Sequence, residues 1–381
     1  MIYLDNAATS WPKPETVYKA VDNCLRTIGA NPGRGGHSMA RSASMLVYEA
    51  REALAELFGI TDSNQLVFTH NATDAINMAV FGLIQQGDTI VTTAMEHNAV
   101  ARAVRVAELR GAYVKIIPNS ASGQLDMEAM KTAIKQNPKA VIMTHASNVT
   151  GTVMPIAEVG KLTKELGVTL MVDAAQTAGV EVIHVNDMHI DILAFSGHKG
   201  LFGPQGTGGL YVQEAIEIRP LRVGGTGSLS ESDEQPEFMP DRLESGTPNT
   251  PGIAGLKAGV EFIMTIGRNK IQAKEMKLTK ELLNGLKHIP GVTVYGEQSV
   301  QGRTAVVSFL LAGRDSGEIT HLLDRDYGIA CRSGLHCAPW AHKTIGTLQT
   351  GTVRLSPGYF NTEEDIGQTI AAIEKIAAQG G

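Results

Sequence analysis

Lys199 lies in the run Phe195-Ser-Gly-His-Lys-Gly-Leu-Phe-Gly, directly after an apolar stretch. A lysine that attacks an aldehyde must have its charge suppressed at the edge of a site, whereas an ordinary lysine extends into water. The small and polar neighbours of Lys199 suit such a Schiff-base lysine. The same run is also compatible with a solvated loop or a phosphate contact, so the assignment depends on the other residues that converge on Lys199.

Asp173 ends the apolar run Leu170-Met-Val and begins Asp-Ala-Ala-Gln. A carboxylate at the end of a buried strand costs free energy unless a cation partners it. A protonated pyridine nitrogen is one such partner, and Mg²⁺ is the main alternative. Gln176 in the same segment could then reach a phenolic oxygen of the ring. The chain has no P-loop and no His-Glu-x-x-His motif, which argues against nucleotide and zinc chemistry, and we expect no metal site.

Three further polar positions follow predicted strands. His97 could stack on a flat cofactor or act as an acid or base. Asn148 suits donation of a side-chain hydrogen bond to a ligand oxygen. Thr73 and the backbone amides of a starting helix could hold a phosphate, while Asn71 or Thr73 as a helix N-cap is equally compatible.

These residues share one predicted edge, because ligands of an open α/β sheet bind beyond the carboxyl ends of its strands. An aspartate for a ring nitrogen, a stacking histidine, a helix-start phosphate cradle and a lysine together indicate a pyridoxal 5'-phosphate site. Ser196 and His198, which flank Lys199, would be further phosphate donors.

Between about residues 40 and 210, helix-period segments alternate with short apolar runs, which predicts an α/β domain on a largely parallel sheet. The predicted helices span 41–58, 72–84 and 98–110. The predicted strands span 65–69, 88–93, 140–144, 169–172 and 190–195.

The second part of the chain has a different pattern. Residues 224–240 are dense in glycine, serine and proline, which predicts a long surface loop. After Gly252 a long helical stretch leads into strands at 292–295 and 304–309, and a helix is expected over 363–378. We predict a large domain of residues 15–255 and a smaller α+β domain of residues 1–14 and 256–381.

Composition sets the class of protein. The 381 residues are 43% hydrophobic, enough for a large core, and the net charge of -6 gives no general attraction to nucleic acid or anionic lipid. We find no leader segment and no apolar run of membrane-spanning length, so we expect a cytoplasmic protein with neither a membrane nor a nucleic-acid partner.

The three cysteines stand at unrelated spacings, which indicates neither a disulfide framework nor a zinc knuckle. Cys337 lies in Arg332-Ser-Gly-Leu-His-Cys, where Arg332 and His336 could stabilise a thiolate. Cys24 lies in a helix-like stretch and Cys331 precedes Arg332, and we expect both to be packing residues.

Taken together, these segments resemble the class V aminotransferase family of fold-type I pyridoxal phosphate enzymes, most closely the cysteine desulfurases and selenocysteine lyases. The likeness spans nearly the whole chain and implies a mainly parallel seven-stranded sheet in a large domain beside a smaller α+β domain. The motifs that carry it are Tyr3-Leu-Asp-Asn-Ala-Ala-Thr, Asn71-Ala-Thr-Asp-Ala-Ile-Asn, Glu96-His97, Ser147-Asn-Val-Thr-Gly, Asp173-Ala-Ala-Gln, Ser196-Gly-His-Lys, Glu244-Ser-Gly-Thr-Pro-Asn and Arg332-Ser-Gly-Leu-His-Cys-Ala.

The resemblance implies a cofactor role for each matching residue. Lys199 would bind the cofactor covalently, Asp173 would contact the pyridine nitrogen and His97 would stack on the ring. Thr247 matches a residue that reaches the phosphate of a neighbouring subunit, which implies a homodimer with shared sites. The residues implied near the phenolic oxygen are Asn148 and Gln176, and those implied at the phosphate are Thr73, Asp74, Ser196 and His198.

The resemblance also implies the reaction. Arg354 would clamp the substrate α-carboxylate with its guanidinium fork, and the freed Lys199 would remove the α-proton. Cys337 would take sulfur from L-cysteine as a persulfide and release L-alanine, and either His97 or His336 could move protons at the sulfur. The residues implied to line the substrate site are Asn148, Arg332, His336 and Arg354.

The Arg-x-Gly-x-His-Cys segment resembles the group whose cysteine sits on a compact loop and which passes sulfur to an acceptor protein in sulfur metabolism, including iron–sulfur cluster assembly. That group has histidine where this chain has Leu335. Three alternatives stay open from the sequence: a selenocysteine lyase, a transaminase of the same family, and a catalytically silent scaffold that binds a sulfur carrier.

Overall fold

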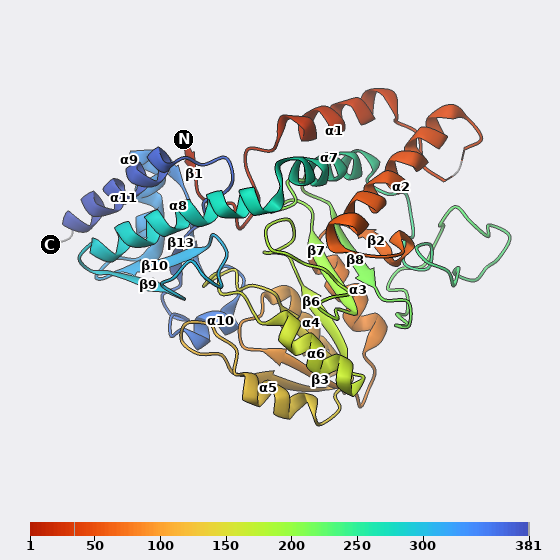
Figure 1. Cartoon of the computed structure of the whole chain (residues 1–381), viewed down its shortest axis with the longest axis horizontal. Helices are drawn as coiled ribbons and strands as arrows, with labels where there is room; N and C mark the ends of the chain where they lie inside the picture. The colour runs from red at the N-terminus through yellow and green to blue at the C-terminus, as the bar shows by residue number, and fades with distance from the viewer. Residues whose placement is uncertain (34, 380–381) are drawn as a thin grey trace.

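A computed structural model describes residues 1–33 and 35–379 (Figure 1). Its largest sheet has seven strands in the order β2-β8-β7-β6-β5-β3-β4, and only β8 runs antiparallel to its neighbours. The predicted mainly parallel seven-stranded sheet is therefore confirmed. The strands are β2 (Leu66–Thr69), β3 (Thr89–Thr93), β4 (Tyr113–Ile117), β5 (Ala140–Thr144), β6 (Thr169–Asp173), β7 (Ile192–Ser196) and β8 (Gly208–Val212).

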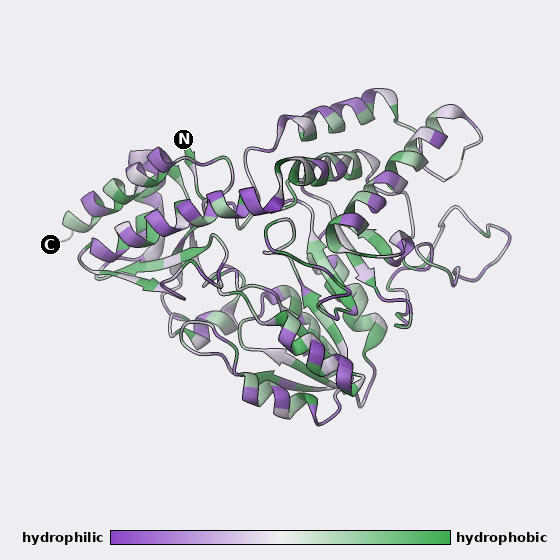
Figure 2. Cartoon of the chain, viewed as in Figure 1, coloured by the Kyte–Doolittle hydropathy of each residue, from purple (hydrophilic) through white to green (hydrophobic). Residues whose placement is uncertain are grey.

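Helices cover both faces of this sheet, because successive side chains of a strand point to opposite faces. Leu170 packs in one apolar cluster with α2 (Ser38–Phe58) and α6 (Ile156–Leu166), while its neighbour Met171 packs in another with α3 (Ala72–Leu83) and α4 (Asn98–Leu109). Every residue of β5, β6 and β7 is buried. Figure 2 shows these strands as a hydrophobic layer inside more polar helices.

A second sheet of four antiparallel strands lies beside the first, in the order β12-β13-β10-β9. The helices α8 (Arg268–His288), α9 (Ser316–Tyr327) and α11 (Glu363–Ala378) pack with it around a separate apolar cluster. The strands are β9 (Val292–Tyr295), β10 (Val307–Leu311), β12 (Arg332–Gly334) and β13 (Thr352–Leu355). The chain also has two short helices, α5 (Met127–Ile134), which follows β4, and α10 (Pro339–Thr344), which follows β12.

Two boundaries differ from those predicted. The strand expected over 304–309 begins only at Val307. Before it, the Thr304 amide donates to the Gly151 carbonyl and the Val306 amide donates to the Thr304 carbonyl, so neither bonds to a neighbouring strand. The long helical stretch is two helices, α7 (Thr250–Ile266) and α8, separated at Gly267, whose φ of 90° only glycine adopts readily.

The first residues lie against the C-terminal half of the chain. Strand β1 (Ile2–Tyr3) pairs in parallel with β11 (Ile329–Ala330), and Asp5 bridges to Ser356. Helix α7 crosses the predicted domain boundary and packs on α1 (Glu15–Thr27) and α2. The division at residues 255 and 256 stays a prediction.

Residues 224–240 contain no helix or strand and extend away from the rest of the chain (Figure 1), as expected of a surface loop. Within the described part of the chain, no helix is both long enough and apolar enough to cross a membrane.

Candidate active site

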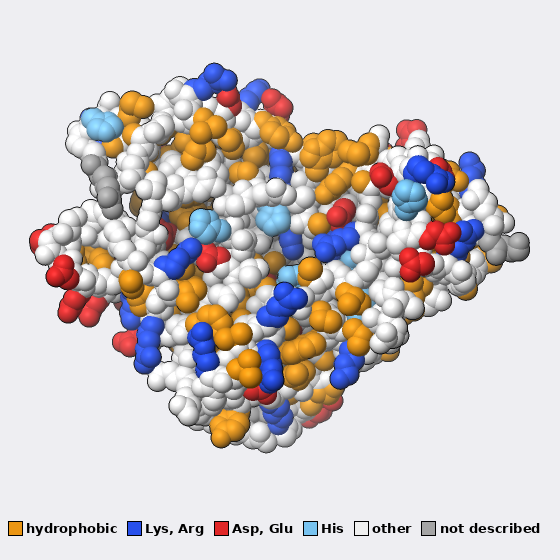
Figure 3. Space-filling model, turned by 180° about the vertical axis from the view of Figure 1, so that it is seen from behind, with side chains coloured by type: hydrophobic (Ala, Val, Ile, Leu, Met, Phe, Trp, Pro, Cys, Tyr) orange, Lys and Arg blue, Asp and Glu red, His pale blue; other side chains and the backbone are white. Residues whose placement is uncertain are grey.

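A cavity of about 290 Å³ lies at the carboxyl ends of the parallel strands, between the two sheets. It brings together most of the residues that the sequence singled out. On the face opposite to that of Figure 1, histidine side chains gather near the middle beside Lys and Arg side chains (Figure 3). The predicted site residues that line the cavity are Thr73, His97, Asn148, Asp173, Gln176, Ser196, His198, Lys199, Arg332, His336 and Arg354.

Lys199 and Asp173 line this cavity at the ends of two adjacent strands, β7 and β6. Lys199 follows β7, and burial by the surrounding protein lowers the pKa of its amine to about 8, although nearby Asp173 opposes this. Asp173 ends β6, where burial raises the pKa of its carboxyl and a hydrogen bond from the Ala175 amide, at 2.9 Å, opposes the rise. A cation placed against Asp173 would stabilise its ionised form.

His97 is the N-cap of α4. Its Nδ1 accepts a hydrogen bond from the Ala99 amide at 3.1 Å, so Nε2 carries the proton of the neutral ring. Burial, together with Lys199, lowers the pKa of His97 to about 4. At neutral pH the ring is therefore uncharged, which suits stacking on a flat ligand better than proton donation.

The start of α3 forms one wall of the cavity. Asn71 Oδ1 accepts from the Asp74 amide at 2.9 Å, which confirms Asn71 as the N-cap. Ser196 Oγ accepts from the Ala72 amide at 3.1 Å. Asp74 lies outside the cavity, where its carboxylate accepts from the His70 amide at 3.1 Å and pairs with Arg222 at 3.0 Å.

Arg354, on β13, is only 1% exposed. Its Nη2 pairs with Asp5 Oδ1 at 2.8 Å, and its Nη1 donates to the Asn148 carbonyl at 3.2 Å. Its Nε has no hydrogen-bond partner among the described residues. We did not predict Asp5 as a site residue, since a pair 349 residues apart leaves no local pattern.

Cys337 is exposed on the short loop between β12 and α10, and it does not itself line the cavity, although its neighbour His336 does. Both His336 and Cys337 have positive φ, 48° and 59°, a conformation that is strained for residues other than glycine. The Cys337 carbonyl accepts from the Asn98 amide and the His336 carbonyl from Asn148 Nδ2, each at 2.7 Å. Arg332 Nη2 lies 3.6 Å from the Cys337 sulfur. Several contacts thus hold the sulfur beside the cavity.

Glu96 is a second residue whose role we did not predict. It is fully buried, and its Oε1 accepts from Thr93 Oγ1 at 2.5 Å and from the Thr144 amide at 3.1 Å. Burial raises its pKa to about 8, so the carboxyl is largely neutral and ties the end of β3 to the end of β5. The sequence shows the glutamate but not its burial.

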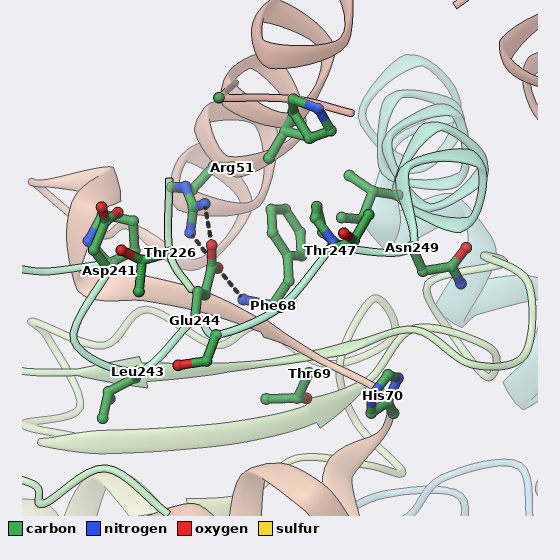
Figure 4. Close-up of a pocket in the computed structure, with 18 of the residues that line it drawn as sticks. Arg51, Phe68, Thr69, His70, Thr226, Asp241, Leu243, Glu244, Thr247 and Asn249 are labelled. Atoms are coloured by element: carbon green, nitrogen blue, oxygen red, sulfur yellow. Dashed lines mark hydrogen bonds and ion pairs between the residues drawn. The ribbon is translucent and has the colours of Figure 1, made fainter. Parts of the chain in front are cut away.

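Thr247 lies apart from these residues, in a second cavity of about 330 Å³ (Figure 4). There Arg51 forms a two-pronged ion pair with Glu244, at 2.9 and 3.0 Å, and Glu244 also accepts from the Phe68 amide. Thr247 does not line the cavity that holds Lys199. Its predicted contact with the phosphate of a neighbouring subunit stays a prediction.

The fold and the site match one family. The profile of the Aminotransferase class-V family matches residues 2–368, so the chain belongs to this family. Among relatives, a probable cysteine desulfurase of Methanothermobacter thermautotrophicus is 36% identical over 100% of this chain and 95% of its own length. A cysteine desulfurase of Escherichia coli is 33% identical over 99% of this chain and 93% of its own length.

Solved structures agree with this assignment. The apo structure of cysteine desulfurase from Thermococcus onnurineus NA1 superposes with a TM-score of 0.94 at 35% identity, covering 99% of this chain and 95% of that one. The cysteine desulfurase CsdA from Escherichia coli superposes with a TM-score of 0.88 at 29% identity, covering 100% of this chain and 95% of that one.

Proposed function

We propose that this protein is a pyridoxal 5'-phosphate-dependent cysteine desulfurase that converts L-cysteine to L-alanine and retains the sulfur as a persulfide on Cys337. The observation that carries the proposal is one cavity lined by Lys199, Asp173 and Arg332, with the sulfur of Cys337 3.6 Å from Nη2 of Arg332. The relatives named as cysteine desulfurases, which match nearly the whole chain, support it over the alternatives.

The polar groups of the cavity fit this cofactor. His198 Nδ1 is buried without a partner in the described residues, and buried polar groups ordinarily have partners. His198 is next to Lys199 in the chain, and Thr73, at the start of α3, lines the same cavity, where the N-terminus of a helix favours an anion. When bound, the cofactor would supply an aldehyde for an amine and an electron sink for the α-carbon.

The chain's own residues have distinct tasks in this proposal. Asp173 would stabilise positive charge at the cofactor's ring nitrogen, and the uncharged imidazole of His97 would stack on the flat cofactor. The Lys199 amine, with its pKa lowered to about 8, is deprotonated often enough at neutral pH to take the α-proton. Arg354 holds the substrate carboxylate, and Asp5 fixes the direction of the guanidinium.

Cys337 carries the sulfur step. Its thiolate attacks the substrate sulfur, so that an S–S bond forms while the substrate C–S bond breaks and its electron pair stays with the carbon fragment. Two protons then complete alanine. The overall exchange, L-cysteine plus enzyme thiol to L-alanine plus enzyme persulfide, balances without an external oxidant. We further propose that the protein acts as a homodimer in the cytoplasm and passes the sulfur to an acceptor protein.

A comparison of two substrates tests the proposal. Cys337→Ala should abolish alanine formation from L-cysteine but leave alanine formation from L-selenocysteine, because selenium leaves carbon more easily than sulfur. Cys331→Ala is the matched control, since Cys331 packs against the apolar cluster of the second sheet. Wild-type protein that releases alanine from selenocysteine alone would replace the proposal with a selenocysteine lyase, and protein inert to both would support a silent scaffold.

A further inference from the structure

The short segment between β3 and α4 contacts both parts of the proposed site. His97, at its end, lines the cavity and is the N-cap of α4. The amide of Asn98, the first residue of α4, donates to the Cys337 carbonyl at 2.7 Å. The Ala94 carbonyl accepts from the hydroxyl of Thr344, on α10, at 3.3 Å. The loop that carries the sulfur is therefore docked on the segment that carries the histidine expected to stack on the cofactor.

Glu96 lies inside this segment and is anchored by its side chain. Among the residues that the structure describes, neither its amide nor its carbonyl bonds to another backbone group. The side chain is fully buried, and its Oε1 accepts from the hydroxyl of Thr93, the last residue of β3, at 2.5 Å. The same oxygen accepts from the amide of Thr144, the last residue of β5, at 3.1 Å. Since β3 and β5 are neighbours, one oxygen ties the segment to two adjacent strands.

Thr144 links this anchor to the cavity. It lines the cavity itself, and in the sheet it is paired with Asp173, the last residue of β6, which lines the cavity as well. The Glu96 side chain is thus attached to the strand beside the one that ends in Asp173, at the edge of the sheet where the site lies.

We propose that Glu96 is a positioning residue that holds both His97 and the Cys337 loop against the cofactor cavity. His97 follows Glu96 directly in the chain, and Asn98, which bonds to the Cys337 carbonyl, comes next. A displacement of Glu96 away from β5 therefore reaches the histidine and the sulfur loop within two residues.

The carboxyl acts here through hydrogen bonds and not through charge. Burial raises the pKa of Glu96 to about 8, and the charge of Asp173 adds to the rise, so the group is largely neutral at neutral pH. Because Oε1 accepts two hydrogen bonds, the proton lies on Oε2, which has no partner among the described residues. A glutamine at this position keeps the accepting oxygen and has no charge, so it separates the two roles.

Hydrogen exchange of backbone amides, followed by mass spectrometry in the purified protein incubated with pyridoxal 5'-phosphate, measures whether the segment stays docked. Glu96→Leu removes the acceptor but keeps a similar volume. The peptide that contains the Asn98 amide should then exchange about ten-fold faster or more, the value of one or two lost hydrogen bonds. Glu96→Gln should exchange within about two-fold of wild type, because its side-chain oxygen can accept the same two bonds.

A milder variant and a matched control complete the test. Thr93→Val removes only one of the two bonds and should accelerate exchange at Asn98 about three-fold, so it decides the matter even if Glu96→Leu does not fold. The control is Asp191→Leu. Burial also raises the pKa of Asp191, and its Oδ2 accepts from the Leu170 amide at 2.8 Å, but this contact joins β7 to β6 at the opposite ends of the strands. Exchange at Asn98 should therefore stay within about two-fold of wild type in the control.

Three results would overturn the proposal. The first is exchange at Asn98 within two-fold of wild type in both Glu96→Leu and Thr93→Val. The second is equal acceleration in Glu96→Gln and Glu96→Leu, because the accepting oxygen would then not be the anchor. The third is equal acceleration in Asp191→Leu, because the effect would then be a general loss of stability.

The catalytic consequence rests on the proposed function. In Glu96→Leu, kcat for alanine formation from L-cysteine should fall about ten-fold or more, and in Glu96→Gln it should stay within about three-fold of wild type. The visible circular dichroism of the bound pyridoxal 5'-phosphate should change only in Glu96→Leu, because the His97 ring shifts against the cofactor. Failure of wild type to use L-cysteine would sink the proposed function alone, since the exchange comparison needs no turnover.

Discussion

At the scale of single residues, the site depends on ionisable groups that the protein removes from water. Burial lowers the pKa of Lys199 and raises the pKa of Asp173, and each residue opposes the shift of the other. Such pairs of perturbed groups in a cavity are typical of catalytic sites. Asp173 is therefore placed to stabilise a cation in the cavity and to keep Lys199 from losing its proton too readily.

Asp173→Asn tests this role with an uncharged side chain of the same shape. We expect alanine formation from L-cysteine to fall by about 10²–10³, the usual cost of one preorganised electrostatic partner. Because Asp173 raises the pKa of Lys199, its loss should lower that pKa further, which pH-dependent labelling of the apo-protein amine would detect. Asp187→Asn, at an exposed position, is the control, and equal activity of the two variants would contradict the role.

Asp5 should act through Arg354. In Asp5→Asn the Arg354 guanidinium loses its ionic partner at Nη2, while the side chain at position 5 keeps nearly the same volume. We expect KM for L-cysteine to rise about ten-fold with kcat within three-fold, because orientation of the carboxylate clamp affects binding more than the later chemistry. Steady-state kinetics beside Asp22→Asn, which breaks an exposed pair with Arg26, would check this, and an unchanged KM would refute it.

At the scale of elements, helices and strands could be predicted from the sequence where a local pattern of residues determines them. The apolar run 140–144 and the capped helix 363–378 match β5 and α11 at both ends. Strand β8 was not predicted, since it begins with two glycines; a side chain at Gly209 would come within 2.3 Å of the Phe195 ring. Strand β4 was missed too, because as an edge strand it is half exposed and lacks a continuous apolar run.

For the site, too, the sequence predicts what depends on local pattern and not what depends on tertiary packing. Lys199, Asp173 and His97 follow strands, so their common edge could be predicted from the order of elements. Asp5 could not be assigned, because its partner Arg354 is brought to it by tertiary packing between distant segments.

The turn after α10 supports the Cys337 loop through backbone contact. A Cβ at Gly351 would come within 2.6 Å of the Gly334 backbone, and its φ of 62° disfavours other residues. Gly351→Ala should therefore lower the free energy of unfolding by about 2–4 kcal/mol. Gly346→Ala is the matched control, with φ of 79° and open space around it, and should cost about 1 kcal/mol. Chemical denaturation that finds equal losses would contradict the steric argument.

At the scale of the whole molecule, a buried carboxyl should make stability fall as the pH rises from about 4.5 to about 8. Glu275, on α8, is 7% exposed, and burial followed by the charge of Glu181 raises its pKa to about 8. Between the unfolded pKa of about 4.5 and this value, the folded state keeps a proton that the unfolded state releases. The stabilising contribution is complete below pH 4.5 and is lost as pH rises towards 8.

Glu275→Gln removes this proton linkage. Relative to wild type, the variant should gain stability between pH 5 and pH 8.5, at up to about 1.4 kcal/mol per pH unit inside the window. Urea unfolding at both pH values would measure the gain. Glu364→Gln, an exposed change on α11, should show no such trend. A constant difference between Glu275→Gln and wild type at the two pH values would contradict the linkage.

The central claim is that Cys337 receives the substrate sulfur. The most direct measurement is mass spectrometry of the Cys337 peptide after the cofactor-loaded protein reacts with L-cysteine in the absence of reductant, with alanine measured in the same sample. We predict one added sulfur atom on Cys337, in amounts equal to the alanine formed in the first turnover, and none on Cys24 or Cys331. Alanine without added sulfur on Cys337, or sulfur on another cysteine, would contradict the account.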